Sequence, residues 1–383
     1  MKVPLLDLTR QYESIREDID SALSKVLLSQ SFILGEEVNE LERKIADYCG
    51  TEYAIGVASG TDALLLSLRA LGIGKGDFVI TTPFTFFATA GAISNAGATP
   101  VFVDIIYDTY NIDPERLENL LKGNSFHCSR LNIKNSRIKA IIPVHLYGQI
   151  ADMDTIINIV DEYGIPVVED ACQAIGAEYQ GKRAGSIGDL GCFSFFPTKN
   201  FGGYGDGGII TTQDKSLEER LRKLRVHGGG RGYYHSMIGY NSRLDTLQAA
   251  VLLAKLPYLN DWNSKRNRNA GYYSKHLKNI EGIDTPTVRE GRKHIYHQYT
   301  IRVKEGRRDE LQKFLKEKNI GTKVYYPFPL HLQECFRNLG YKKGDFPVSE
   351  KAANKVLSLP VFPELNLDEI DHVCDSIKEF FNS

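Results

Sequence analysis

Strand-like apolar segments alternate with helical patterns along the first part of the chain. The helical patterns are at residues 36–48, 63–71 and 88–95, and the strand patterns are at residues 53–58, 78–80, 101–103 and 140–144. Strands that alternate with helices predict a mostly parallel sheet covered by helices on both faces. The chain is therefore expected to have an α/β fold, with ligands at the carboxyl ends of its strands.

The length of 383 residues favours one large and one smaller domain. We predict a large domain over residues 1–256 and a small domain over residues 257–383. Pro257 and the polar run 260–269 follow a long helical stretch at 243–256 and predict a bend between the two. Within the small domain we predict a strand at 299–303, a helix at 308–318 and an amphipathic last helix at 367–381.

Composition excludes several classes of function. The formal net charge of −1 offers no long-range attraction for nucleic acid or an anionic membrane. No apolar run approaches the roughly 20 residues that span a bilayer, and Asp7 interrupts the start before a signal peptide can develop. The six cysteines lack the paired spacing of a zinc site. We expect reduced thiols, no bound metal and a cytoplasmic location.

Two residues suggest a cofactor. Lys199 lies between an aromatic segment and a glycine-rich turn, and Asp170 ends an apolar strand that begins at Val167. A shielded lysine can lose its proton near neutral pH and hold pyridoxal phosphate, while an acid at a strand end can pair with the ring nitrogen of that cofactor. Taken singly, such an Asp is equally well explained as a helix cap, and such a Lys as a surface residue. Their order along the chain favours the cofactor.

Other segments can complete such a site. Gly60 and Thr61 lie between a strand and a helix, where backbone amides and a hydroxyl can meet a phosphate. A plain helix cap by Ser59 or Thr61 is the alternative. Phe86 follows another strand end and can stack on a pyridine ring. The glycine-rich run 202–208 allows close backbone approach, but it lacks the context of a dinucleotide-binding fingerprint.

Several motifs then occur in a fixed order. They are Ser-Gly-Thr-Asp-Ala-Leu at 59–64, Glu-Asp-Ala-Cys-Gln at 169–173, Ser-Phe-Phe-Pro-Thr-Lys-Asn at 194–200 with Gly-Asp-Gly-Gly at 205–208, and Asn-Ser-Arg-Leu-Asp at 241–245. Together they resemble the DegT/StrS family of nucleotide-sugar aminotransferases, and the resemblance runs almost from end to end. It implies pyridoxal phosphate fold type I: a mostly parallel, seven-stranded sheet in the large domain, a smaller α+β C-terminal domain, and a homodimer with shared active sites.

The resemblance also implies roles for individual residues. Lys199 would form the Schiff base and shuttle protons, and Asp170 would pair with the pyridine nitrogen. Gln173 would touch the ring or its phenolic oxygen, and Phe86 would stack on the opposite face. The phosphate would be held by Gly60, Thr61, Ser194 and, from the partner subunit, Asn241. The substrate side would include Tyr147, in the loop 145–148, together with Tyr325 and His331.

The family mechanism is ping-pong transamination with glutamate as the amino donor and a nucleotide-linked keto sugar as the acceptor. Because Lys199 is present, transamination is favoured over the dehydration that histidine-bearing relatives carry out. The motif around Lys199 resembles the branch that aminates C3 of the sugar. Expected substrates are a dTDP-3-keto-6-deoxyhexose or a UDP-3-keto-N-acetylhexosaminuronate, on the way to surface polysaccharide or glycoconjugates. Amination at C4, a cyclitol aminotransferase, a sugar dehydratase and a non-catalytic regulator that binds pyridoxal phosphate stay open as alternatives.

Two further segments are candidate nucleotide-binding loops. The segment 122–139 is longer and more basic than the usual connection in the family, which indicates either a solvated surface loop or a contact with nucleotide phosphates. Arg231 follows three glycines at 228–230 and offers a fork of donors to a diphosphate. A flexible turn is the alternative interpretation of this second segment.

Overall fold

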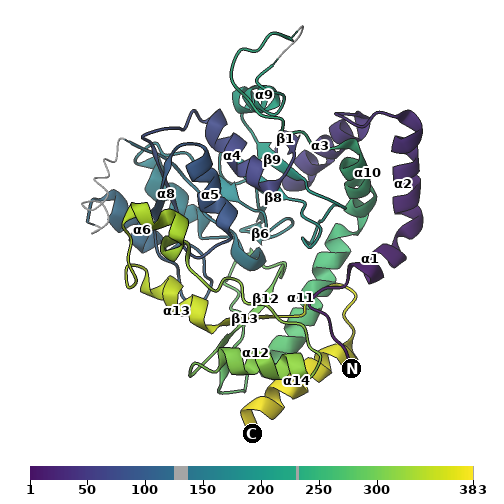
Figure 1. The fold of residues 1–383 in the computed structure, drawn as a ribbon, viewed down its shortest axis with the longest axis vertical. Coiled ribbons are helices and arrows are strands. Elements are labelled where there is room, and N and C mark those ends of the chain that lie inside the picture. The colour runs from purple at the N-terminus through teal and green to yellow at the C-terminus, as the bar shows by residue number, and fades with distance from the viewer. Residues whose placement is uncertain (125–136, 230–232, 383) are drawn as a thin grey trace.

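The computed structural model describes residues 1–124, 137–229 and 233–382. Most of segment 122–139 and Arg231 lie outside the described residues. Figure 1 shows a large layered part above a smaller C-terminal part, with both chain ends in the smaller part. No helix among the described residues is long and apolar enough to cross a membrane.

Seven strands among the described residues form the central sheet. Two groups, β3-β2-β4 and β5-β8-β9-β1, are joined between β4 and β5 by parallel bridges and by the bond from Asp170 N to Pro143 O at 3.0 Å. The strands are β1 (Tyr53–Val57), β2 (Phe78–Thr81), β3 (Thr99–Phe102), β4 (Ile138–Ile141), β5 (Val168–Asp170), β8 (Leu190–Ser194) and β9 (Gly208–Thr212). Only β9 runs against its neighbours in this sheet. The expected mostly parallel α/β sheet is confirmed.

Helices cover both faces of the sheet because successive strand residues point to opposite sides. Ala54 packs with one group of helices and Ile55 with the other, and Ile80 and Val79 do the same on β2. The first group is α3 (Glu36–Cys49), α6 (Pro114–Leu121), α8 (Met153–Asp161) and α10 (Thr246–Lys255), and the second is α4 (Gly60–Ala70), α5 (Phe87–Asn95) and α9 (Lys215–Leu224). The predicted helices at 36–48, 63–71 and 88–95 correspond to α3, α4 and α5.

The C-terminal part is an α+β unit. Its antiparallel strands are β10 (Ile283–Asp284), β12 (Tyr299–Val303) and β13 (Val356–Leu359), and its helices are α11 (Leu259–Leu277), α12 (Arg308–Glu317), α13 (Pro347–Lys355) and α14 (Leu367–Asn382). Val3 from the start of the chain pairs with Ile320 and packs into the core of this unit. The short helix α1 (Leu8–Ser14) leads back along α2 (Arg16–Ser29) to the large part. The domain boundary after residue 256 stays a prediction.

The polar run 260–269, predicted as a bend, is instead part of the 19-residue helix α11. Figure 1 shows this helix descending from the end of α10 towards the C-terminal helices. The inner face of α11 carries Asn263, Arg266 and Asn269, whose side chains are buried and hydrogen-bonded to backbone carbonyls. Because polar residues occupy core-facing positions, the helical pattern of the segment is hidden from a reading based on hydrophobicity.

Candidate active site

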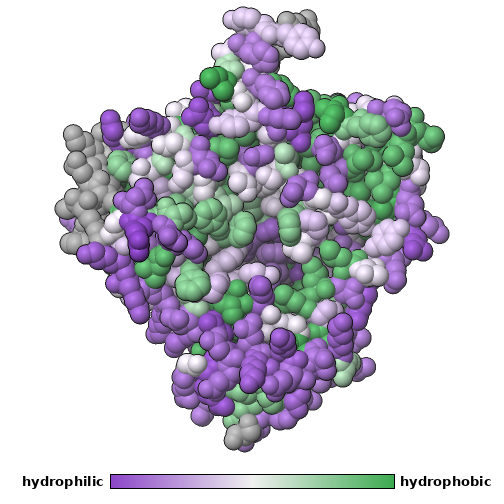
Figure 2. Space-filling view, viewed as in Figure 1, coloured by the Kyte–Doolittle hydropathy of each residue, from purple (hydrophilic) through white to green (hydrophobic). Residues whose placement is uncertain are grey.

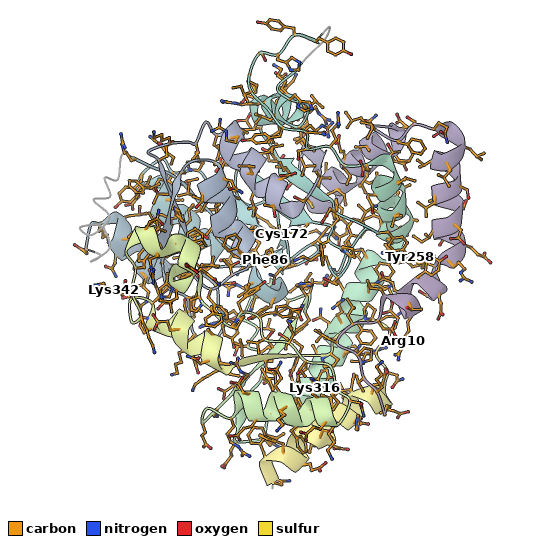
Figure 3. All side chains as sticks on the ribbon, viewed as in Figure 1. Arg10, Phe86, Cys172, Tyr258, Lys316 and Lys342 are labelled. Atoms are coloured by element: carbon orange, nitrogen blue, oxygen red, sulfur yellow. The ribbon has the colours of Figure 1, made fainter. Side chains whose placement is uncertain are left out.

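A cavity of about 640 Å³ opens between the carboxyl ends of β5 and β8 and the C-terminal part. Figure 2 shows a hollow near the centre of the molecule, and Figure 3 places Phe86 and Cys172, which both line the cavity, at the same position. The predicted residues that line it are Gly60, Thr61, Phe86, Asp170, Gln173, Ser194, Lys199 and Tyr325. Residues from five separate segments of the chain therefore meet at one cavity.

Lys199 lies in a tight turn that follows β8. Its backbone N–H donates to the Phe196 carbonyl at 2.9 Å, and its side chain is partly buried in the cavity wall. Burial lowers the pKa of the Lys199 ammonium and outweighs the opposite effect of Cys172 and Asp170. A lysine with a lowered pKa holds more neutral amine near pH 7, which is the form that attacks an aldehyde.

Asp170 is the last residue of β5 and is only 6% exposed. Thr89 Oγ1 donates to its Oδ2 at 2.7 Å, and the backbone N–H of Cys172 approaches Oδ1 at 3.3 Å. Thr85 in turn lies 3.1 Å from Thr89, between the hydroxyl oxygens. The carboxylate is thus fixed in orientation and still borders the cavity, as a partner for a protonated ring nitrogen requires.

The amino end of α4 forms a cradle for an anion. Ser59 caps this helix by accepting from Asp62 N at 3.1 Å, so the helix-cap alternative is confirmed for Ser59. A Cβ on Gly60 would lie 2.6 Å from Ser194 Cβ and 3.1 Å from Cys172 Sγ. Only glycine fits there, and the helix end with the neighbouring Thr61 and Ser194 hydroxyls provides donors for a phosphate. The amine, the acid and this cradle together fit pyridoxal phosphate.

Gln173 is held in place by two bonds. Its Nε2 donates to the Tyr326 hydroxyl at 3.0 Å, and its Oε1 accepts from Tyr147 N at 2.9 Å. The Tyr147 ring is buried behind this side chain, and its hydroxyl donates to the Tyr325 carbonyl. Tyr147 therefore supports Gln173 and Tyr325 from outside and does not line the cavity itself.

Three other predicted residues are located away from the cavity wall or outside the described residues. His331 is buried, and its Nε2 lies 3.1 Å from Glu350 Oε1, while its neighbours Leu330 and Gln333 do line the cavity. Asn241 lines a separate hollow that shares Asp206 with the main cavity. Arg231 lies outside the described residues.

The cavity also contains residues that the sequence did not indicate. They include His297, Gln298, Lys323 and Tyr326. Most of them come from the last third of the chain, where no motif with a known chemical role surrounds them. Only the sequence Tyr-Tyr-Pro at 325–327, next to the predicted Tyr325, gave a signal that could have included Tyr326.

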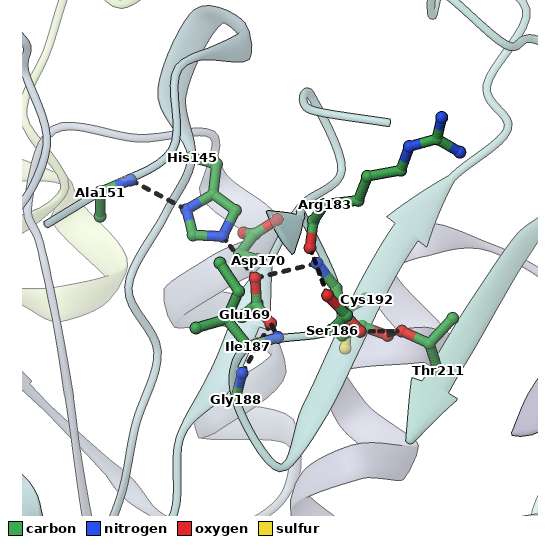
Figure 4. Close-up of polar contacts among 12 residues, drawn as sticks. His145, Ala151, Glu169, Asp170, Arg183, Ser186, Ile187, Gly188, Cys192 and Thr211 are labelled. Carbon is green, nitrogen blue, oxygen red and sulfur yellow. Dashed lines mark hydrogen bonds and ion pairs between the residues drawn. The ribbon is translucent and has the colours of Figure 1, made fainter. Parts of the chain in front are cut away.

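Beneath Asp170, the preceding residue Glu169 organises a buried polar cluster (Figure 4). Its carboxylate is fully buried and accepts from three backbone N–H groups, those of Gly185 at 2.9 Å and of Ile187 and Gly188 at 2.7 Å. His145 Nε2 lies 2.8 Å from the same carboxylate and donates to it, because His145 Nδ1 accepts from Ala151 N. Glu169 thereby ties the end of β5 to the loop before β8.

Replacing Glu169 with glutamine is expected to destabilise the fold by about 3 kcal/mol at pH 7, because the new amide would face N–H donors in a dry interior. Burial raises the pKa of Glu169, but the bonds from His145 and the backbone outweigh it and the net pKa is lowered from 4.5. The stabilisation is therefore present above pH 4.5 and is lost as the pH falls through the lower folded value. Urea unfolding at pH 7 and in acid measures both effects.

Glu178→Gln is the matched control, since Glu178 is partly exposed and pairs with Lys293 at the surface at 3.0 Å. It should cost less than about 1 kcal/mol. Two outcomes would contradict the assigned role: equal effects of the two substitutions, or a difference in the free energy of unfolding between wild type and Glu169→Gln that grows in acid.

Comparison with known proteins gives the family. Residues 13–378 match the DegT/DnrJ/EryC1/StrS aminotransferase family. A pleiotropic regulatory protein of Geobacillus stearothermophilus is 50% identical, with 100% of this chain and 99% of that protein covered. A UDP-N-acetyl-3-dehydro-alpha-D-glucosamine 3-aminotransferase of Acidithiobacillus ferrooxidans is 43% identical, with 98% and 97% covered. The crystal structure of S. venezuelae DesV in complex with a ketimine intermediate has a TM-score of 0.94 at 41% identity, with 100% and 99% covered. The chain thus belongs to the DegT/DnrJ/EryC1/StrS family of pyridoxal phosphate-dependent aminotransferases.

Proposed function

We propose that this chain transfers the amino group of L-glutamate to C3 of a nucleotide-linked 3-keto sugar. The observation that carries the proposal is the meeting of Lys199, Asp170 and the Gly60 cradle in one cavity. Each alone has an ordinary structural explanation, but the three together supply an amine, an acid and a phosphate site. That combination is what transamination with pyridoxal phosphate requires.

Each residue then has a defined task. Pyridoxal phosphate, when bound, supplies a ring that accepts electrons and so lets an amino group leave one carbon and join another. Lys199 Nζ holds the cofactor and, once released, takes the proton from the carbon of glutamate and delivers a proton to the sugar carbon. Asp170 keeps the ring nitrogen protonated, and Gly60, Thr61 and Ser194 bind the phosphate. Phe86 would stack on one face of the ring, Gln173 would touch the other face or the phenolic oxygen, and Tyr325 would border the sugar.

The choice of C3 rests on two observations. The residues around Lys199 resemble the C3-aminating branch of the family, and a 43% identical relative is named as a 3-aminotransferase of a UDP-linked sugar. A dTDP-3-keto-6-deoxyhexose and a UDP-3-keto-N-acetylhexosaminuronate are the two substrates we propose to compare. C4 amination and cyclitol amination are the nearest competing activities because they use the same residues.

A regulatory role is a second candidate, because a 50% identical relative is named as a pleiotropic regulatory protein. A regulator that only binds the cofactor needs the phosphate cradle but has no need of both Lys199 and Asp170 facing the same cavity. Turnover of a nucleotide sugar separates the two roles. A protein that binds pyridoxal phosphate and aminates no substrate would support the regulator.

The test is a two-step assay on the cofactor-loaded enzyme. Glutamate first converts the bound cofactor to its amine form, and a panel of 3-keto and 4-keto nucleotide sugars is then added while the return of the visible absorbance is followed. We expect return with a 3-keto sugar and an amino-sugar product by mass spectrometry. Return only with 4-keto sugars would refute the assignment of C3, and no return with any sugar would refute the proposed function.

The proposal includes a homodimer and a cytoplasmic location. Within one chain Asn241 does not line the cavity of Lys199, so a phosphate contact by Asn241 requires a second subunit. Leu27, Leu28 and Ile33 are more than half exposed, and Figure 2 shows a hydrophobic area at the upper right over α2, α3 and α10. An exposed apolar surface of this kind favours a protein partner. Sedimentation at micromolar concentration checks this, and a monomer would contradict it.

A further inference from the structure

His297 is a cavity residue for which the proposed mechanism has no task. It lies two residues before β12 and lines the same cavity as Lys199, although the side chain is only 8% exposed. Burying a histidine has a cost unless its ring nitrogens are used. Its hydrogen bonds therefore indicate which of the two nitrogens faces the ligand.

A chain of amides fixes the proton on Nδ1 of this ring. Asn263 Nδ2 donates to the Ile175 carbonyl at 3.1 Å, which leaves Asn263 Oδ1 to accept from Asn200 Nδ2 at 2.8 Å. Asn200 Nδ2 also donates to the Ile295 carbonyl at 3.1 Å, so both of its N–H groups are in use. Asn200 Oδ1, 3.3 Å from His297 Nδ1, can then only accept. His297 Nδ1 carries the proton, and Nε2 has a free lone pair.

Nε2 of this ring opens into the cavity. Within the described ranges 1–124, 137–229 and 233–382, no residue makes a hydrogen bond with Nε2, and the atom is not fully buried. Burial, with the Lys199 and Arg266 charges nearby, lowers the pKa of His297 well below its usual value. The ring therefore stays neutral in the working range, and Nε2 presents an acceptor to whatever occupies the cavity.

The chemistry of the two substrates decides which of them can use this acceptor. Glutamate presents two carboxylates, which only accept hydrogen bonds and are repelled by a lone pair. Apart from the amine that is consumed, its atoms offer no donor to Nε2. A sugar presents hydroxyl groups, which donate. We propose that His297 Nε2 accepts a hydrogen bond from a hydroxyl of the keto sugar and so helps to select the acceptor substrate, an inference that rests on the proposed function.

Two substitutions separate the two nitrogens. His297→Asn keeps a donor near Asn200 but has no atom at the position of Nε2, whereas His297→Gln returns an acceptor oxygen close to that position. We expect His297→Asn to bind the nucleotide-linked amino-sugar product about 5- to 10-fold more weakly by calorimetry, as loss of one hydrogen bond predicts. In His297→Asn the rate of the sugar half-reaction should fall more than the rate of the glutamate half-reaction. His297→Gln should recover most of the sugar binding.

His294→Asn is the matched control. His294 is also buried in the same segment, but it does not line the cavity, and its Nδ1 accepts from Tyr296 N at 2.9 Å. We expect its sugar affinity to stay within about 2-fold of wild type, well below the change expected for one hydrogen bond. Unaltered sugar binding by His297→Asn, or an equal loss in both half-reactions, would overturn the inference.

Deoxy sugars identify the hydroxyl and provide the second test. Wild type should bind a product analogue that lacks the contacted hydroxyl more weakly than it binds the parent sugar. His297→Asn should bind the analogue and the parent sugar equally well, which is the signature of a coupled pair. If removing each hydroxyl in turn lowers the binding affinity of both proteins equally, His297 contacts no hydroxyl and the inference fails. If wild type binds none of the nucleotide sugars, the proposed function fails first, so the two failures are distinguishable.

Discussion

Replacing Lys199 with alanine is expected to abolish transamination, with a fall of at least about 10⁴-fold, the upper end of what a general acid–base residue contributes. Lys199 lies in the cavity wall, and burial lowers the pKa of its amine. The proposed reaction uses this amine both to hold the cofactor and to move protons. Cofactor-loaded wild-type protein treated with borohydride should carry a reduced phosphopyridoxyl group on the peptide that contains residue 199. The variant should carry none.

Lys323→Ala provides the matched control for this experiment. Lys323 also lines the cavity, but its side chain is exposed, so it lacks the burial that lowers the pKa of Lys199. The control should keep the covalent adduct on the peptide that contains Lys199. If the adduct disappeared in Lys323→Ala and survived in Lys199→Ala, the cofactor would be linked to Lys323, and the assignment of Lys199 would be refuted.

The alternating pattern was enough to predict five of the seven strands of the large part and the helices α3, α4 and α5. Its strands are buried on both faces and read as short apolar runs, and its helices carry ordinary amphipathic stripes. The pattern did not indicate β8, nor β9, which is antiparallel to both neighbours and begins at Gly208, directly after the glycine-rich run. Strand direction is set by how the chain returns to the sheet, and a local pattern does not contain that information.

More of the predicted cofactor residues than of the predicted substrate residues line the cavity. Asp170 ends β5, and Gly60 and Lys199 follow the ends of β1 and β8, where a short motif reports both the backbone position and the chemistry. His297 and Lys323 reach the cavity only because the C-terminal part folds against the sheet. The resemblance to the family located the segments of Tyr147 and His331 but not the direction of their side chains, and both are buried beside the cavity.

Replacing Asp170 with asparagine is expected to lower kcat/KM by about 10²- to 10³-fold while the protein stays folded. The substitution keeps the shape of the side chain, and Thr89 Oγ1 can still donate to the remaining oxygen. What is lost is the negative charge in a site that is 6% exposed, where removing one member of an ion pair costs about 3–5 kcal/mol. Without that charge the ring nitrogen of the cofactor is no longer held protonated, and electron withdrawal weakens in both half-reactions.

Thr89→Val tests the same position without removing the charge. It deletes a neutral donor and leaves the carboxylate, so its effect on kcat/KM should be about 10-fold or less. Both half-reactions should slow equally in Asp170→Asn, unlike in His297→Asn, because the cofactor takes part in each of them and the sugar in only one. If Asp170→Asn retained more than a tenth of the wild-type kcat/KM, the charge at residue 170 would not support catalysis, and the carboxylate would be a structural partner of Thr89 and Cys172 alone.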